Sequence, residues 1–330
     1  MLVACLLSAC TTAPRERKTG WRDDLVFAIR RDQVKAVSRI LAEQAVSPEV
    51  ALNDNSLTPL MIAGRANSPE VARWLLDHGA SVDAATKAED GTALVGACDS
   101  GYREIVRLLV ERGAKVNRKD GRGWSPLLAA VDQRHNDVVQ LLIAHGADIN
   151  AEFPNGRSVL MVAAETGDAS LVQALLAKGV AVNHVAANGE DALIQAAAED
   201  HAEVVTLLLQ KGAQINLQDA EGWTALAKAA ALGHCQSVKA LCEAGADPTI
   251  RNKFGRAALD YARGIDGTGK FTKAKDFTAA VEKGLLQQEE LYYALARKEK
   301  ESGRDYECVV RVLEDNGKRM QEKRDAAARK

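Results

Sequence analysis

Apolar residues recur along most of the chain as pairs of short helical segments separated by polar turns. In one such unit, Leu127 and Ala130 lie three positions apart, so a large and a small side chain share one helix face. Ser125 and Pro126 precede them, as a helix N-cap and a first helical residue. A second apolar stripe follows, and Gly146 then supplies the left-handed position that ends a helix. The pattern predicts a helix–turn–helix unit.

This unit repeats along the chain. Its small helix residue recurs at intervals of 33 or 34 residues, at Ala63, Ala97, Ala130, Ala163, Ala196 and Ala229. A closing glycine recurs in a second register, at Gly79, Gly113, Gly146, Gly179, Gly212 and Gly245. One unit cannot bury its own apolar face, so neighbouring units must stack into a continuous core. We expect six good repeats.

The period and the motif Thr58-Pro59-Leu60, which returns as Ser125-Pro126-Leu127, resemble the ankyrin repeat over roughly residues 23–265. The resemblance implies an all-α solenoid of helix–turn–helix repeats with β-hairpin fingers. Residues 21–283 are therefore assigned to the repeat domain, with degenerate repeats at both ends as caps. The family's His after Pro-Leu is absent throughout, which predicts looser fingers. Arg134 replaces a turn glycine, at a cost of about 1 kcal/mol if it is held in a left-handed conformation.

Beyond residue 283 the repeat stops, and residues 284–330 are predicted to form a helical tail. Apolar residues have helical spacing in 285–295 and again in 306–313. Asn316-Gly317 is expected to end the second helix, leaving a charged, frayed terminus. We expect the apolar faces of the tail to cover the open end of the solenoid. The alternative is a separate helical arm that binds a partner.

The first residues of the chain bear on the cellular location of the protein. Residues 1–9 are apolar apart from Ser8, and the run Leu7-Ser8-Ala9-Cys10 resembles the lipobox of bacterial lipoproteins. The resemblance implies a signal peptide at 1–9, lipidation of Cys10 and a solvated tether over 10–20. It places the protein on a membrane facing the periplasm, and Thr11 after the cysteine favours the outer membrane. The run is short and has no basic residue before it, so a cytosolic ankyrin protein remains the alternative.

Composition narrows the function classes. The 43 basic and 45 acidic side chains give a net charge of −2, which argues against a general nucleic-acid binder. No run approaches the roughly 18 apolar residues of a membrane-spanning helix. The six cysteines have no paired spacing, so no disulfide framework is predicted. Cys98 and Cys242 fall on helix core positions, and no partner is apparent for Cys308.

The sequence contains no convincing catalytic or metal-binding motif. The segment Gly264–Lys270 has the glycine spacing of a phosphate-binding loop, but Phe271 stands where a Ser or Thr would ligate Mg²⁺. None of the six histidines has metal-ligand spacing, and their repeat positions indicate structural roles. We therefore predict a protein that is not an enzyme and holds no cofactor or metal. A nucleotide-binding or enzymatic protein that uses the Gly264 loop is the competing interpretation.

The resemblance implies that a protein partner binds the finger tips and the concave face of the first helices. In two repeats the residue just before the Ser or Thr helix cap is a tryptophan, Trp124 and Trp223. We expect both side chains to be exposed and to anchor a protein partner. The alternative is that each Trp stiffens its neighbouring finger. The full predicted surface consists of Trp124, Asp132, Gln133, Phe153, Arg157, Glu165, Thr166, Glu190, Glu199, Trp223 and Leu232. We therefore expect the protein to be a monomeric binding module with an inhibitory, immunity or scaffolding role.

Overall fold

The computed structural model describes residues 20–87, 91–263 and 306–328, which form sixteen helices. The predicted signal peptide, most of the tether, the Gly264–Lys270 loop and the helix expected over 285–295 lie outside the described residues. The chain divides into two compact units, Met1–Lys115 and Val116–Lys330. Each unit is built from helix pairs and is described by itself.

Unit 1 contains three helix pairs. Their bounds are α1 (Trp21–Arg30) with α2 (Val34–Glu43), α3 (Pro59–Ala66) with α4 (Pro69–Asp77), and α5 (Ala93–Asp99) with α6 (Arg103–Glu111). The first helices α1, α3 and α5 pack on one another in that order, and α2, α4 and α6 form a second row. Thr58 and Thr92 begin α3 and α5 as N-caps whose hydroxyl oxygens accept backbone amide hydrogen bonds.

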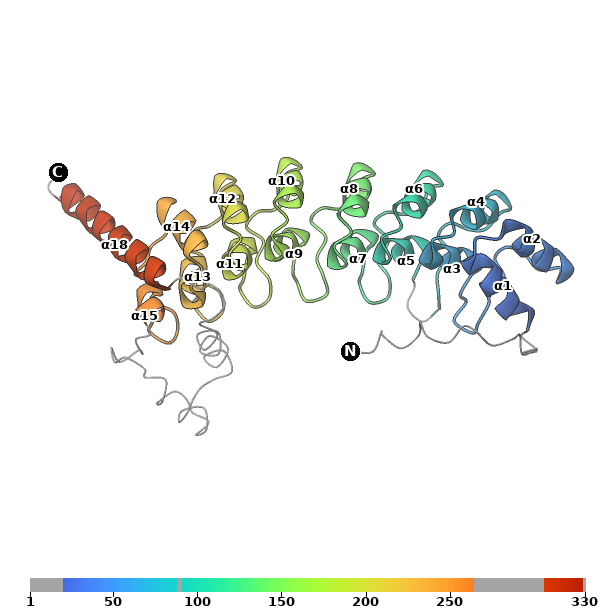
Figure 1. Ribbon diagram of the computed structural model, residues 1–330, viewed down its shortest axis with the longest axis horizontal. Coiled ribbons are helices and arrows are strands. Elements are labelled where there is room, and N and C mark those ends of the chain that lie inside the picture. Colours follow the sequence, from blue (N-terminus) through green and yellow to red (C-terminus); the bar gives the residue numbers. More distant parts are fainter. Residues whose placement is uncertain (1–19, 88–90, 264–305, 329–330) are drawn as a thin grey trace, which may run out of the picture. The chain divides into compact units, whose positions relative to one another are not determined.

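Unit 2 continues the same pattern with four full pairs. They are α7 (Pro126–Asp132) and α8 (Asn136–Ala144), α9 (Val159–Thr166) and α10 (Ala169–Ala177), α11 (Ala192–Ala198) and α12 (Ala202–Gln210), and α13 (Ala225–Leu232) and α14 (Cys235–Glu243). Two further helices, α15 (Ala258–Arg263) and α18 (Tyr306–Ala328), follow. In Figure 1 the first helices of the pairs form the lower row, and the loops that join successive pairs extend beneath them.

The core of each unit is built from the repeating Leu and Ala positions. In unit 2, Leu127 and Leu160 are 1% and 0% exposed, and Ala130 and Ala163 are 0% and 1% exposed. The small alanine lets the second helix of each pair approach the first closely. The turn between the two helices takes a left-handed residue, and Arg134 adopts φ 60° there. The left-handed conformation considered for this arginine is therefore confirmed.

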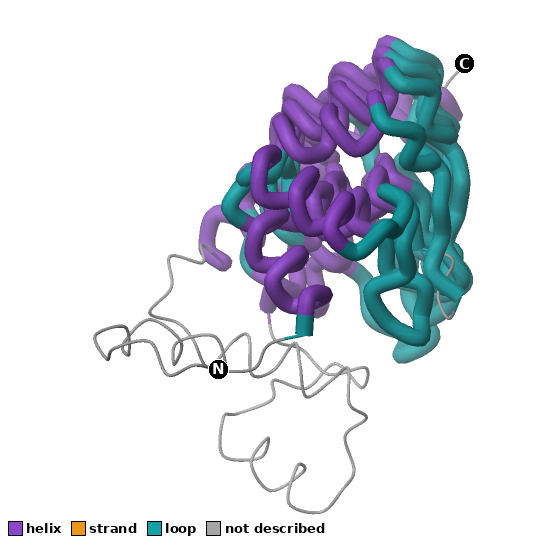
Figure 2. Tube along the Cα trace, turned by 90° about the vertical axis from the view of Figure 1, so that its right-hand side faces the viewer, coloured by secondary structure: helices purple, strands orange, loops and turns teal. Residues whose placement is uncertain are grey.

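The fingers that join successive pairs are tight turns. The described residues contain no β-strand, and one isolated bridge between Glu152 and Ser158 is their only β-type pairing, so the expectation of β-hairpin fingers is wrong. The physical reason is visible in the finger before α7, where Asp120 Oδ1 accepts the amides of Arg122 and Trp124 at 3.0 and 2.9 Å. This side-chain turn closes the loop without a ladder. Figure 2 shows these loops gathered on one side of the helices.

A ladder of asparagines links successive loops of unit 2, although the family's His is absent. Asn150 Oδ1 accepts the amide of Ala181 at 2.9 Å, and Asn183 Oδ1 accepts the amide of Gln214 at 3.0 Å. The equivalent bonds from the same register are made by Asn117 and Asn216. Each bond ties one repeat to the next through an exposed backbone amide.

The tail helix α18 covers the end of unit 2, as the sequence predicts. It packs against α14 and α15, and its Val309 and Leu313 are 0% and 2% exposed. Tyr306 Oη donates to the carbonyl of Ala231 at 3.0 Å. A disulfide joins Cys308 of α18 to Cys235 of α14, with the two Cα atoms 6.0 Å apart. A partner for Cys308 was not predictable from the sequence, because the two cysteines are 73 residues apart.

The expected end of this helix at Asn316-Gly317 is wrong, since α18 runs on to Ala328. Asn316 is buried, and its Nδ2 donates to the carbonyl of Ala246 at 3.3 Å, which holds it in the helix. The residues that follow are rich in Lys, Arg, Glu and Ala, whose helix propensity offsets a penalty of about 1 kcal/mol at Gly317. Among the helices described in both units, none has the length and apolar character needed to cross a membrane.

Candidate protein-binding groove

A groove of about 470 Å³ opens in unit 2 between α7, the finger over residues 151–157 and α9. Six residues of the predicted binding surface line it: Trp124, Asp132, Phe153, Arg157, Glu165 and Thr166. Arg134, Pro154, Asn155 and Val162 complete the lining. Residues from three successive segments of the chain therefore meet in one concavity, because equivalent repeat positions stack.

An aromatic pair forms one wall of this groove. Trp124 is half-buried and meets Phe153 edge to face, with ring centroids 5.4 Å apart and planes at 88°. Phe153 is 7% exposed, so it supports the wall and contributes little free surface. The backbone amide of Trp124 donates to Asp120 Oδ1, which fixes the backbone that carries the indole. Such an aromatic loses little conformational entropy when a partner covers it.

Charged side chains border the aromatic wall. Arg157 pairs with Glu165, and both side chains stay partly accessible at 27% and 39%. Asp132 at the end of α7 and Arg134 in the following turn are exposed. The border therefore carries two acidic and two basic groups around an apolar wall, the arrangement of a polar rim around an interface core.

Trp223 and Leu232 are buried, so the expectation that they lie on an accessible surface is wrong. Trp223 is 2% exposed, and its ring lies 4.4 Å from that of Tyr261 in α15. Leu232 is 4% exposed at the end of α13. Both positions are covered because the degenerate last repeat supplies a large tyrosine, and α18 closes the end of the unit. Trp223 packs on a helix residue, Tyr261 of α15, whereas the alternative interpretation stacks it on a neighbouring finger.

Glu190 is also engaged within the protein. It pairs with Lys228, which is 7% exposed and lies 3.0 Å from Asp219 Oδ2 on its other side. Burial lowers the pKa of Lys228, but the two carboxylates raise it by more than burial lowers it. The pKa of Lys228 therefore lies above its ordinary value. The charge of Glu190 is thus neutralised in place. Gln133 and Glu199 are exposed and lie outside the lining of the groove.

Sequence reasoning missed four lining residues, and the repeat register contains the signal for two of them. Val162 lies two positions after the repeated core leucine Leu160, and Arg134 occupies the left-handed turn between α7 and α8. Pro154 and Asn155 lie on the same finger as Phe153, and only the fold of that finger shows which of its side chains face the groove.

The histidines and free cysteines have the structural roles that the sequence indicates. His201 Nε2 lies 3.0 Å from the carbonyl of Glu165, and His234 Nε2 lies 3.0 Å from that of Ala198. Each ring thus contacts the end of a first helix in the preceding repeat. Burial raises the pKa of the Cys98 thiol well above its usual range and that of Cys242 to about 11, which keeps both thiols unreactive. The described residues contain no cluster of side chains suited to a metal ion.

Comparison with known proteins gives consistent matches. A family model described as ankyrin repeats (3 copies) matches residues 3–86, 25–120, 83–153 and 160–252. The ankyrin repeat and KH domain-containing protein mask of Drosophila melanogaster is 38% identical over 111 residues, which are 33% of this chain and 3% of that protein. The chain therefore resembles only a small part of this relative.

Two solved structures have the same architecture. The crystal structure of the human ASB11 ankyrin repeat domain matches with a TM-score of 0.59 and 29% identity, covering 68% of this chain and 98% of that one. The ankyrin repeat domain of Bcl-3, described as a unique member of the IkappaB protein family, matches with a TM-score of 0.54 and 30% identity. That match covers 62% of this chain and 92% of the Bcl-3 chain. The helical solenoid predicted from the repeats is confirmed.

Proposed function

The chain belongs to the ankyrin repeat family, and from this premise we propose that the groove at Trp124 binds a segment of another protein without catalysis. Ankyrin repeats are protein–protein interaction modules. The observation that carries the proposal is the Trp124–Phe153 wall with its rim of Asp132, Arg134 and the Arg157–Glu165 pair. A buried aromatic anchor ringed by polar groups is typical of binding hot spots.

Site-specific photo-crosslinking in intact cells tests this groove. A photoreactive amino acid is placed at position 155, where Asn155 is exposed and lines the groove. The matched control places it at position 140, where Gln140 is exposed on α8 outside the groove. We expect a discrete crosslinked protein from position 155 alone, and its loss when Trp124→Ala is added.

Two results would overturn the proposal. Equal crosslinking from both positions would mean that the groove is not the binding surface. An unchanged crosslink in the Trp124→Ala protein would remove the aromatic wall as the anchor. The variant is suited to this test because Trp124 is only half-buried, so its removal leaves the repeat core intact.

The same proposal includes a location: export, lipidation of Cys10 and anchoring to a bacterial membrane facing the periplasm, with the outer membrane preferred. The lipobox resemblance at Leu7–Cys10 supports it. The Cys235–Cys308 disulfide adds independent support, because disulfides persist in oxidising compartments and are rare in the cytosol. There the protein acts as an inhibitor, immunity protein or scaffold, as a monomer that does not bind nucleic acid.

Metabolic labelling with an alkyne-bearing palmitate tests the anchor. Cys10→Ser is expected to abolish labelling and to release the protein from the membrane fraction. Cys5→Ser removes a cysteine from the same apolar run and is expected to leave both unchanged. Labelling that persists in Cys10→Ser, or that is absent from the wild type, would favour the cytosolic alternative. A labelled nucleotide whose binding is lost in Lys270→Ala would instead favour the nucleotide-binding alternative.

A further inference from the structure

One repeat position, near the end of each first helix, changes charge along the chain. Its occupants are Arg30, Arg65 and Asp99 in unit 1, followed by Asp132 and Glu165 in unit 2. Asp132 and Glu165 line the groove described above. Arg30 and Arg65 therefore occupy, in the first two helix pairs, the repeat position that a carboxylate occupies in the next three pairs.

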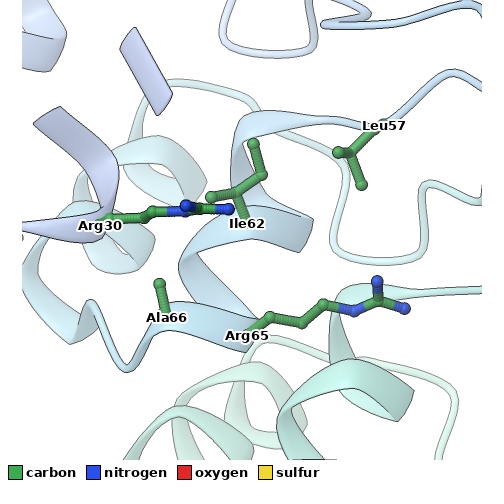
Figure 3. Close-up of a pocket in the computed structure, with 5 residues that line it drawn as sticks. All are labelled: Arg30, Leu57, Ile62, Arg65 and Ala66. Atoms are coloured by element: carbon green, nitrogen blue, oxygen red, sulfur yellow. The ribbon is translucent and has the colours of Figure 1, made fainter. Parts of the chain in front are cut away.

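The two arginines border a second concavity, of about 440 Å³, within unit 1. Leu57, Ile62 and Ala66 provide its apolar lining. Figure 3 shows the Arg30 side chain extending from α1 toward Ile62 of α3, with Leu57 and Arg65 bordering the other side. Leu57 and α3 thus form an apolar floor, with Arg30 of α1 on one side and Arg65 of α3 on the other.

Neither arginine has a carboxylate partner among the residues that the structure describes. Both are exposed, whereas Arg157 at the corresponding groove of unit 2 is paired with Glu165. A guanidinium is weakly hydrated and presents a fork of donors that fits a carboxylate in two parallel hydrogen bonds. The charge of this concavity is therefore available to an incoming anion.

A glycine holds Arg65 in position. A Cβ at Gly96 of α5 would lie 2.8 Å from Arg65 Cγ and 2.9 Å from its Nε, so the arginine stem lies across a helix face that is free only because residue 96 is glycine. The stem of the Arg65 side chain therefore packs on α5 before any partner arrives. Restriction of a long cationic side chain lowers the entropy lost on binding.

The apolar surface extends beyond the concavity to α1. Phe27, at the repeat position of Ile62, is 56% exposed, which makes it one of the few exposed large apolar side chains in the described chain. It lies three residues before Arg30 and carries the Arg31 guanidinium 4.5 Å from its ring centroid. An exposed aromatic beside cations marks an interaction surface.

We propose that this unit 1 surface, made of Phe27, Arg30, Leu57, Ile62 and Arg65, binds an acidic segment of a protein partner. Two carboxylates pair with Arg30 and Arg65, and an apolar side chain between them lies on Leu57 and Ile62. First helices of adjacent repeats lie about 10 Å apart, a span that about three residues of extended chain cover. The inference rests on the proposed function, since the occupant is a protein segment, but it uses residues outside the Trp124 groove.

Fluorescence anisotropy with defined peptides tests the surface on the full chain. The probe is a short fluorescein-labelled peptide of alternating glutamate and leucine, and the control peptide has glutamine in place of glutamate. The Arg30→Gln/Arg65→Gln protein is compared with Arg103→Gln/Arg107→Gln, which removes two exposed arginines of α6 in the same unit. We expect the glutamate peptide alone to bind, with Kd at least about tenfold weaker in the first variant and unchanged in the second.

Three results would overturn the inference: equal binding of both peptides, equal loss in both variants, or no binding of the glutamate peptide. Vesicles containing phosphatidylglycerol are measured in parallel. If they bind through Arg30 and Arg65 while the peptide does not, the surface is a membrane contact and the protein-segment proposal fails. Trp124→Ala should leave peptide affinity unchanged, which separates this test from that of the Trp124 groove.

Discussion

Cys235, the first residue of α14, is joined by a disulfide to Cys308 in the first turn of α18, with 73 residues of sequence between them. The bond ties the tail helix to the last full helix pair at the point where Tyr306 also reaches the carbonyl of Ala231. An open solenoid end exposes apolar surface, and α18 removes that surface from water. The bond therefore secures the cap of the repeat array.

Removing this bond should destabilise the C-terminal end of unit 2. For a loop of this length the chain-entropy model gives about 4 kcal/mol. We expect Cys235→Ser/Cys308→Ser to lower the protection of α14 and α18 amides in hydrogen exchange, while α7 to α10 stay protected. Local loss is expected because each repeat contacts only its neighbours.

Cys242→Ser is the matched control for that measurement. Cys242 lies in α14 beside Asn316 of α18 but has no disulfide. Its hydroxyl replacement keeps a polar contact with Asn316 and should leave the exchange pattern unchanged. Equal protection of α18 in the oxidised protein and the double serine variant would contradict a capping role for the disulfide.

The two tryptophans at one repeat position should respond differently to removal. Trp223 is 2% exposed against Tyr261, so Trp223→Ala is expected to cost about 3–5 kcal/mol of unfolding free energy. Trp124 is half-buried, and Trp124→Ala should cost about 1 kcal/mol through the lost Phe153 contact. Urea denaturation followed by circular dichroism measures both. Equal losses would contradict their different environments.

This pair of tryptophans shows how far the repeat pattern predicts the site. The register correctly places both residues before a helix cap, and it correctly predicts the solenoid and most helix pairs. It cannot show that Tyr261 covers Trp223, because that contact depends on how a degenerate repeat packs. Trp124 meets a regular repeat instead, and its surroundings bring together six of the predicted residues.

The errors at the C-terminal end have the same origin. The Cys235–Cys308 pairing and the course of α18 through Asn316-Gly317 depend on tertiary contacts between segments far apart in sequence. Local signals favoured a helix stop at Asn316, but its hydrogen bond to Ala246 outweighs them. Local propensity is a weak guide wherever tertiary contacts oppose it. The fingers differ for another reason, since the turn formed by Asp120 replaces strand pairing.

Stability should depend on pH through Asp191, the N-cap of α11. Burial raises its pKa from 3.8 to about 6, although the amide of Ile194 donates to Asp191 Oδ1 at 2.8 Å and lowers it. A carboxyl with the higher pKa in the folded state stabilises that state below pH 3.8, and this contribution is lost as pH rises through about 6. A difference of about two pKa units corresponds to about 3 kcal/mol.

Asp191→Thr isolates this effect, because Thr92 and Thr224 cap equivalent helices. The variant should gain stability relative to the wild type as pH rises from about 4 to 7, by up to about 3 kcal/mol. Denaturation curves at a series of pH values measure the difference. A gap between the two proteins that does not change with pH would mean that Asp191 has an ordinary pKa.

Two glycines on neighbouring first helices of unit 1 should give opposite results when changed to alanine. A Cβ at Gly64 would lie 2.8 Å from the backbone oxygen of Ala93, so Gly64→Ala must separate α3 from α5 and should cost about 1–3 kcal/mol. A Cβ at Gly96 meets the Arg65 side chain instead. Gly96→Ala should preserve stability while weakening binding of the glutamate–leucine peptide. Unchanged peptide binding in the Gly96→Ala protein would contradict the positioning of Arg65 by Gly96.

Arg134 and Asp200 occupy the same left-handed turn position, with φ 60° and 58°, but only Asp200 gains a bond there. Its Oδ1 accepts the amide of Ser237 in the first turn of α14 at 3.0 Å. Arg134 has no carboxylate to make such a bond, so its strain of about 1 kcal/mol is not offset in that way. Arg134→Gly should therefore raise the free energy of unfolding by about 1 kcal/mol, whereas Asp200→Gly should not raise it, because the strain relieved is balanced by the lost bond to α14.

Arg134 also lines the Trp124 groove, so the crosslink from position 155 in the Arg134→Gly protein shows whether the strained arginine contributes to binding. A weaker crosslink in a more stable protein would mean that Arg134 contributes to partner binding at a cost in stability. An unchanged crosslink would mean that this arginine has no role in binding.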